Sequence, residues 1–378
     1  MQISPTTSDP GLSQVPQQYV RYTPSVEAVS PEEQRVINEI TATFGRIGQK
    51  TAEHYQHAVR GVHAKSHAIL KGNFEVLGNL PFEFRQGLFS EAKSYPVVVR
   101  LSASPGDVLS DKVSASRGFA LKVIGIRNWP MIAQHAGEVT QDFLFSNGKY
   151  FPAKTIDSFL SQLKLLETET TRLPRVKEAV SGISRAANAC LRALGAESAS
   201  LDFFGHPPKH FLADSFGSQA PIRYGDYIAK MLVRPSSALL AAVGGLTHDL
   251  GKSFSVIQED LGEFFESNSA EFDLCVQLCT DLKKMPVEDA SVEWSEHESP
   301  YVPVARIIFP MQISDSPTRK MYGDDVLSFS PAHSLEAHRP LGSIMRARLQ
   351  VYGPSSQFRH LVNARPSVEP RSSAEIPD

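Results

Sequence analysis

The chain has 378 residues, of which 41% are hydrophobic and 21% are charged, and these proportions are ordinary for a folded globular protein. Its net charge of −3 excludes a strong electrostatic attraction to nucleic acid or to an anionic membrane surface. The three cysteines form no CxxC pair, so they predict neither a disulfide framework nor a zinc knuckle. No apolar run reaches the length of a membrane span and no secretory leader is recognisable, so we expect a cytoplasmic protein.

The N-terminal part begins with a polar arm. Residues 1–30 are rich in Ser, Pro, Thr and Gln, a composition typical of a segment without a core of its own. Ser30 is placed to cap a helix, Pro31 suits its first position and Glu33 completes a capping box. Apolar residues then recur at helical spacing, which predicts an amphipathic helix over residues 31–50.

Short β-branched and aromatic runs follow this helix, separated by Gly, Pro, Asp and Ser. They predict strands at residues 68–76, 96–101, 118–124, 143–145, 227–233, 272–278 and 302–309. Residues 155–200 have a helical pattern, residues 236–267 are mixed, and residues 366–378 form a polar tail that we expect to be disordered. Strands dispersed among helices predict one α+β domain over residues 31–365, built on an antiparallel sheet or barrel.

A histidine-rich run lies between the first helix and the first strand. His54, His57, His63 and His67 invite a zinc-site interpretation, but no further ligands of fixed spacing accompany them. A core or surface position is the default for any one of these histidines. His63 is distinguished by its context, the hexapeptide RGVHAK that begins at Arg60.

The most informative stretch lies near the C-terminal end. Arg348, Tyr352 and Arg359 stand at i, i+4 and i+11, which places them within about 40° on one face of a helix. A guanidinium one turn before a phenol stabilises the phenolate, which is a hard anionic ligand suited to ferric iron. Gly353 and Pro354 predict a bend before Arg359. The alternative is a basic surface helix with one amphipathic tyrosine.

Taken together and in order, these motifs resemble the haem catalases, and in particular their short catalase-related branch. The resemblance rests on RGVHAK, PVVVRLS, RGFALK, the segment 272–294 and the arginine–tyrosine–arginine series, and it covers roughly residues 50–360. It implies a catalase-like antiparallel β-barrel core with surrounding helices and a haem b cofactor. It further implies that Tyr352 ligates the iron, that Arg348 supports Tyr352, and that Arg359 pairs with a haem propionate. The chain lacks the length for the C-terminal domain of large catalases.

The resemblance also implies a distal side to the site. There His63, preceded by Val62, would move the proton of a bound peroxide, and Ser102 would orient its ring. Arg60 and Arg100 would face the propionates, for which a guanidinium fork is well suited. Without the resemblance, Arg100 and Ser102 would be interpreted as an ordinary strand end.

A distal carboxamide is expected to hold the peroxide by hydrogen bonds. Asn147 is the closest match to the family position, although Lys149 stands where the family has proline. Gln141 is the rival, and both residues could instead be ordinary loop or edge residues. Phe151 and Phe159 are candidate pocket aromatics, although core packing explains them equally well.

The expected activity is therefore haem-dependent reduction of hydrogen peroxide or an organic hydroperoxide, with an unknown reductant. The alternatives are a fatty-acid hydroperoxide dehydratase or lyase of the allene oxide synthase type, and a haem-dependent biosynthetic oxidase. The dehydratases carry Thr where Val62 stands, which favours peroxide reduction. A haem-binding protein without enzymatic activity is the least favoured alternative. Neither nucleic acid nor a membrane is an expected partner, and the sequence leaves open whether the chain forms a homo-oligomer.

Overall fold

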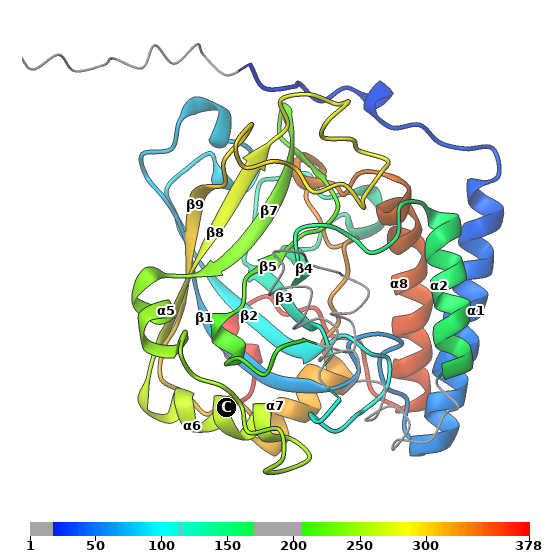
Figure 1. The fold of residues 1–378 in the computed structure, drawn as a ribbon, viewed down its shortest axis with the longest axis vertical. Helices are drawn as coiled ribbons and strands as arrows, with labels where there is room; N and C mark the ends of the chain where they lie inside the picture. Colours follow the sequence, from blue (N-terminus) through cyan, green and yellow to red (C-terminus); the bar gives the residue numbers. More distant parts are fainter. Residues whose placement is uncertain (1–17, 114, 170–205) are drawn as a thin grey trace, which may run out of the picture.

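An antiparallel β-barrel forms the centre of the fold (Figure 1). The computed structural model describes residues 18–113, 115–169 and 206–378. In these residues the strands are β1 (Ser66–Val76), β2 (Ser94–Ala103), β3 (Arg117–Ile124), β4 (Thr140–Asn147), β5 (Phe216–Gly217), β6 (Ile222–Tyr224), β7 (Tyr227–Pro235), β8 (Ala270–Leu278) and β9 (Val302–Phe309). Their order is β5-β4-β3-β2-β1-β9-β8-β7-β6, and β5 also pairs with β7. That pairing closes eight strands into a barrel and leaves β6 attached to β7, so the predicted α+β barrel is confirmed.

Alternation along the strands decides which side chains fill the barrel. Phe119 and Leu121 of β3 are fully buried in the barrel core, whereas Lys122 points to the outer face. The ring of Phe119 on β3 lies 5.5 Å from the rings of both Phe216 on β5 and Phe272 on β8. Each such aromatic contributes about 1.5–3 kcal/mol by leaving water, so the interior holds the strands in register.

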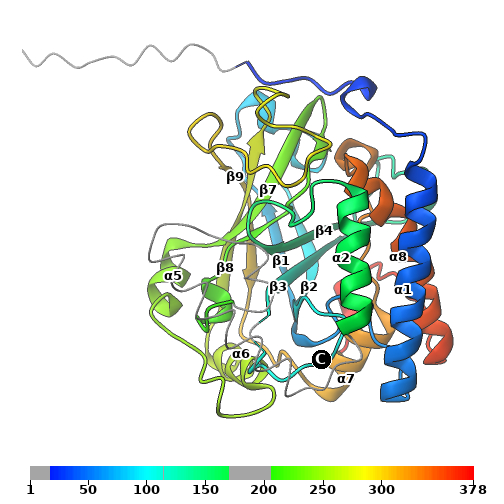
Figure 2. The same ribbon diagram turned by 45° about the vertical axis from the view of Figure 1, so that its right-hand side comes forward.

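Three helices lie side by side against one side of the barrel, as Figures 1 and 2 both show. They are α1 (Glu33–Tyr55), α2 (Ile156–Glu169) and α8 (Ser343–Val362). Ile40 and Phe44 of α1, Leu160 of α2, and Ile344 and Val351 of α8 share one buried apolar cluster. The other α-helices within the described ranges are α5 (Ser237–Val243), α6 (Val256–Ser267) and α7 (Pro317–Met321). Helix α7 continues into the π-helical turn η6 (Tyr322–Val326).

The predicted start of the first helix is wrong in its detail. The helix begins at Glu33 and extends to Tyr55, five residues beyond its expected end. Glu33 forms no capping box, because its carboxylate lies 2.6 Å from Nε of Arg346 on α8. Ser30 still serves the helix end, since its carbonyl accepts a hydrogen bond from the Glu33 backbone N–H.

The C-terminal tail, which we expected to be disordered, lies against the barrel. Ile376 is only 2% exposed and belongs to an apolar cluster with Ile69 and Val98. Asp378 lies 3.1 Å from a guanidinium nitrogen of Arg319. The tail is polar in composition, but one buried isoleucine and specific ion pairs fix its position. The segment 236–267, which had no clear pattern, contains α5 and α6.

Other expectations have mixed outcomes. Helix α8 continues through Pro354, so the predicted bend does not end it before Arg359. Of the helical stretch 155–200, residues 156–169 form α2, and residues 170–200 lie outside the described part of the chain. The first 17 residues of the predicted arm also lie outside it.

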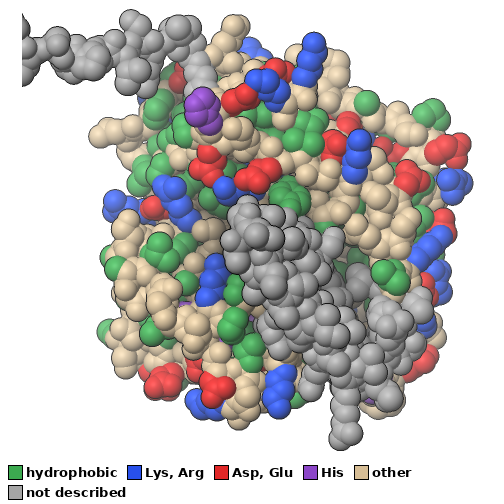
Figure 3. All heavy atoms as spheres, in the orientation of Figure 1, with side chains coloured by type: hydrophobic (Ala, Val, Ile, Leu, Met, Phe, Trp, Pro, Cys, Tyr) green, Lys and Arg blue, Asp and Glu red, His purple; other side chains and the backbone are tan. Residues whose placement is uncertain are grey.

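No helix in the described ranges combines the length and apolar character that crossing a membrane requires. On the face drawn in Figure 3, acidic and basic side chains are interspersed.

Candidate active site

A cavity of about 740 Å³ lies between the helices and the outer face of the barrel. This volume is typical of sites that enclose a small molecule or cofactor. Side chains that alternate with the barrel core face it from the strands, among them Arg100 and Ser102 of β2 and Leu144 of β4. Phe44 of α1, Phe159 of α2, and Arg348 and Tyr352 of α8 line it from the helices.

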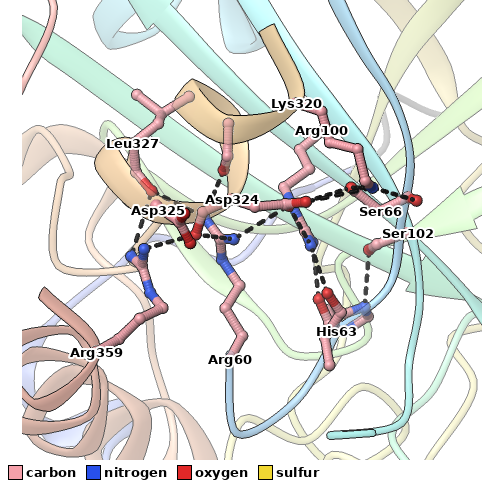
Figure 4. Close-up of polar contacts among 12 residues, drawn as sticks. Arg60, His63, Ser66, Arg100, Ser102, Lys320, Asp324, Asp325, Leu327 and Arg359 are labelled. Atoms are coloured by element: carbon pink, nitrogen blue, oxygen red, sulfur yellow. Dashed lines mark hydrogen bonds and ion pairs between the residues drawn. The ribbon is translucent and has the colours of Figure 1, made fainter. Parts of the chain in front are cut away.

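His63 is held rigidly at the edge of this cavity. Its backbone has a positive φ of 56°, an uncommon conformation outside glycine. The Arg100 guanidinium donates to the His63 carbonyl at 2.8 Å, and the His63 N–H donates to the Ser104 carbonyl at 2.8 Å. The ring nitrogen Nδ1 lies 3.1 Å from Ser102 Oγ (Figure 4). Ser102 therefore orients the ring and leaves Nε2 without a protein partner among the described residues.

The surroundings keep the His63 imidazole neutral. Burial, together with the positive charges of Arg100, Arg348 and Arg60, lowers the pKa of His63 to about 3. Near neutral pH the ring therefore has a free lone pair and can accept a proton from a molecule in the cavity.

Gly118 of β3 makes room for this ring, a role that the sequence did not indicate. A Cβ at position 118 would lie 2.5 Å from Nδ1 of His63 and 3.0 Å from Ser102 Oγ. Real Cβ atoms do not approach that closely, so any larger residue would displace the imidazole. The only sequence signal was the position of Gly118 directly after Arg117 in the RGFALK strand.

Tyr352 and Arg348 come from α8 and line the same cavity. Nη2 of Arg348 donates to the Tyr352 hydroxyl at 2.9 Å, and the guanidinium lies 5.2 Å from the centre of the phenol ring. Met345, one turn earlier, places its sulfur 3.3 Å from the other terminal nitrogen of Arg348. The predicted helical face is therefore present, and one cavity holds both a neutral imidazole and a guanidinium-supported phenol.

Three arginines gather beside the cavity around one half-buried aspartate, Asp324 of η6 (Figure 4). Nε of Arg100 donates to the Asp324 carboxylate at 3.0 Å, and Arg60 and Arg359 donate to its backbone carbonyl at 2.9 and 2.6 Å. Burial alone would raise the pKa of Asp324, but Arg100, Lys320 and Arg60 hold it well below its usual range. Asp324 was not anticipated from the sequence.

Positive charge remains in excess within this cluster. Burial, followed by repulsion from Arg100 and Arg359, lowers the pKa of Arg60 well below its usual value. Arg60 and Arg100 line the cavity, whereas Arg359 lies behind them, with its nitrogens bonded to Leu327 and Ser328 as well as Asp324. The cavity wall at Arg60 and Arg100 is thus suited to an anionic group of a ligand.

The comparisons with known proteins add one finding. No protein-family model matches the sequence, and no curated protein matches it either. Among solved structures, a fungal catalase superposes with a TM-score of 0.56 at 15% identity, covering 81% of this chain and 61% of that one. Catalase A from Saccharomyces cerevisiae gives 0.55 at 17% identity, with coverages of 82% and 65%, and a bacterial catalase gives 0.56 at 16%, with coverages of 95% and 67%.

The chain has the catalase fold. The fold expected from the sequence motifs is therefore confirmed. Identities of 15–17% establish the fold and leave activity and cofactor to be argued from the residues of this chain. The match spans only 61% and 65% of the fungal catalase and of catalase A, so the activity of the whole protein is a matter for proposal.

Within this catalase fold, the two candidate carboxamides occupy different places. Asn147 ends β4 at the seam where β5 closes the barrel, and it lines the cavity. Its Oδ1 accepts from the Arg117 backbone N–H, so Nδ2 is the group left to donate to a ligand. Gln141 is 1% exposed, its Oε1 accepts from the Leu335 N–H at 2.8 Å, and it does not line this cavity. The structure therefore brings Asn147, and not Gln141, to the catalase-fold cavity.

The remaining expected residues also have clear positions. Val62, Phe151 and Phe159 line the cavity and also pack against the helix cluster, so the pocket and packing interpretations both hold for the two aromatics. Their rings meet edge to face at 5.4 Å. The histidine run does not converge on one point. His57 pairs with Asp325 at 2.9 Å, and buried His67 packs against Phe211.

Proposed function

We propose that this protein is a haem-dependent, catalase-like oxidoreductase that reduces hydrogen peroxide or an organic hydroperoxide. The observation that carries the proposal is the presence of neutral His63 and Arg348-supported Tyr352 in one cavity of a catalase fold. A titratable base with a strongly perturbed pKa that lines the same cavity as a potential metal ligand is typical of catalytic sites.

The residues of the cavity fit a haem b. Tyr352 offers an oxygen ligand on the helix side, and the bond from Arg348 favours its negatively charged form. Arg60 and Arg100 line the cavity, and their guanidinium groups suit the two propionates. Phe159 and Leu144 offer apolar surface to the porphyrin, on opposite sides of the cavity. When bound, the haem supplies a ferric iron that exchanges electrons with peroxide.

The protein side of the reaction is then proton transfer and orientation. His63 Nε2 accepts the proton from one peroxide oxygen and returns it to the other, as base and then as acid. Ser102 holds Nδ1 at 3.1 Å, so the ring keeps one orientation during both steps. Asn147 donates from Nδ2 and fixes the peroxide without competing for its proton.

The proposal is tested by haem titration followed by product analysis. The purified protein, titrated with haemin, is expected to bind one equivalent and then to consume hydrogen peroxide. A protein that binds no haem, or a haem-loaded protein that leaves peroxide intact, would contradict the proposal. With a lipid hydroperoxide, an alcohol formed only in the presence of an electron donor supports peroxide reduction. An epoxide or ketol formed without a donor would replace it with the dehydratase reaction.

A further inference from the structure

A second polar cluster lies on the outer face of the barrel. Its base is formed by Lys122 of β3 and Asp142 of β4, which are paired across the two strands and lie 2.7 Å apart. Both are almost fully buried, because the loop before α8 and the C-terminal tail cover this part of the sheet. The loop contributes His333 and the tail contributes Glu369.

Three side chains at the rim of this cluster present metal-ligand atoms to one another. Nδ1 of His135 lies 3.0 Å from Oε1 of Glu138, and Nε2 of His333 lies 3.6 Å from Oε2 of Glu138. The three ligand atoms lie within 4.8 Å of one another. Zinc bonds of 2.0–2.1 Å in tetrahedral geometry place neighbouring ligand atoms about 3.4 Å apart. Each histidine nitrogen lies close to this separation from one carboxylate oxygen of Glu138, Oε1 for His135 and Oε2 for His333.

The tautomer of His333 is set for a metal. Its Nδ1 lies 3.0 Å from Oδ2 of Asp142 and 3.2 Å from the Lys122 ammonium. Lys122 donates to Glu369 and forms an ion pair with Oδ1 of Asp142. Because an ionised carboxylate can only accept, Nδ1 carries the proton and donates it to Oδ2 of Asp142. In the neutral ring the lone pair is therefore on Nε2, which lies 3.6 Å from Oε2 of Glu138. A carboxylate bonded to the remote nitrogen of a histidine is the usual second partner of zinc-ligating histidines.

The backbone holds the two ligand segments together without a metal. Ile132 N–H donates to the Ser334 carbonyl at 2.9 Å, and Asp142 N–H donates to the His333 carbonyl at 2.7 Å. The segment that carries His135 and the loop that carries His333 therefore run side by side. The three ligand atoms are preorganised, so binding a metal would require little rearrangement.

The charges of the cluster also call for a cation. Lys122 contributes one positive charge, whereas Glu138, Asp142 and Glu369 contribute three negative charges, which leaves two negative charges when both histidines are neutral. One divalent ion or two added protons would neutralise it. The Oε2 atom of Glu138 is buried and accepts no hydrogen bond within the part of the chain that the structure describes, and only the ion-pair distance of 3.6 Å joins it to His333. A cation bound here would satisfy it.

We propose that His135, Glu138 and His333 bind one Zn²⁺ ion, with water in the remaining position. Two imidazoles and one carboxylate suit zinc and disfavour magnesium and calcium, which prefer oxygen ligands. The other triad in the described residues, Asp142, His333 and Glu369, is less suitable, because the Lys122 ammonium already lies among its carboxylates. The ion would clamp the turn before β4 to the loop that leads into α8, a structural role separate from the proposed peroxide chemistry.

The test uses the full-length protein, freed of metal by a chelator, with Zn²⁺ alone as the probe at pH 7.5. Calorimetric titration is expected to show one equivalent bound, and zinc is expected to raise the melting temperature. Glu138→Gln and His135→Ala change partly exposed side chains, and each is expected to weaken binding at least tenfold. His297→Ala, at an exposed histidine outside the cluster, is the matched control and should bind zinc as the wild type does.

Two outcomes would overturn the proposal. One is that the wild-type protein binds no equivalent of Zn²⁺ tightly, which would mean that protons neutralise the cluster. The other is unchanged zinc binding in both His135→Ala and Glu138→Gln, which would place the ion elsewhere. In crystals soaked with zinc, an anomalous peak at the zinc edge between His135 and His333 would support the assignment directly.

Discussion

Arg348 and Tyr352 lie one turn apart on α8, and the guanidinium of Arg348 donates to the phenol oxygen at 2.9 Å. Both residues line the cavity, so the bond places a positive charge beside the phenol oxygen there. The pair is the feature on which haem binding depends in the proposed function.

The first prediction concerns this pair. Tyr352→Phe is expected to lose haem or to change its absorption spectrum, because the ligand oxygen is removed. Arg348→Ala is expected to weaken haem binding roughly tenfold. This factor corresponds to the free energy of about 1.4 kcal/mol that a charge-assisted hydrogen bond contributes. Haemin titrations measure both effects. Gln350→Ala, at an exposed position on the same helix, should leave the titration unchanged. An unaltered spectrum in Tyr352→Phe would exclude Tyr352 as the ligand.

The second prediction separates the distal residues. His63→Ala is expected to lower the rate of the peroxide step on the order of 10²–10⁴-fold while haem remains bound, because the proton acceptor is lost and the iron ligand is retained. Asn147→Ala should lower the rate of the peroxide step by a smaller factor, since it removes one hydrogen bond and leaves the proton path intact. Rates are compared per bound haem. If Gln141→Ala lowered the rate more than Asn147→Ala, the choice between the two carboxamides would be wrong.

The third prediction concerns the missing side chain at position 118. Gly118→Ala places a Cβ about where the His63 ring now lies, so the imidazole must move away from Ser102. We expect at least a tenfold lower peroxide rate with normal haem content. Gly45→Ala is the matched control, because a Cβ there meets nothing within 4 Å and lies in the interior of α1. Equal rates in Gly118→Ala and wild type would show that the position of the ring does not matter.

The fourth prediction concerns acid stability. Burial is the main cause that lowers the pKa of both His63 and His338 to about 3. In the unfolded chain these groups bind protons below about pH 6.5, whereas the folded protein does not until about pH 3. The stability that they contribute is therefore complete above pH 6.5 and is lost as the pH falls towards 3.

Urea unfolding between pH 7.5 and 4.5 measures this loss. Each of these two histidines is expected to add a slope of up to about 1.4 kcal/mol per pH unit below pH 6.5. The glutamine side chain in His338→Gln can still accept a hydrogen bond from the Leu88 N–H. This variant should therefore reduce the slope of the unfolding free energy against pH by the contribution of one proton. A slope identical to that of wild type would mean that His338 does not remain neutral in the folded protein.

The sequence alone was sufficient for features that depend on neighbouring residues. The spacing of Arg348 and Tyr352 determines a shared helical face, because helix geometry is local. Alternating apolar residues placed the main strands, and the order of motifs indicated the barrel and the cavity residues. Glu33 shows the limit of this logic. Its local pattern predicted a capping box, but an arginine some 300 residues away attracts the carboxylate instead.

Only the tertiary structure decided which distant groups meet. Asn147 was distinguished from Gln141 by its place at the closing seam of the barrel, which depends on the pairing of β4 with β5. Asp324 became the partner of three arginines because η6 packs beneath them, and Gly118 became necessary because the His63 ring lies against β3. Local periodicity is encoded in adjacent residues, whereas strand pairing and the choice of counter-ions are determined by long-range packing, which has no period in the sequence.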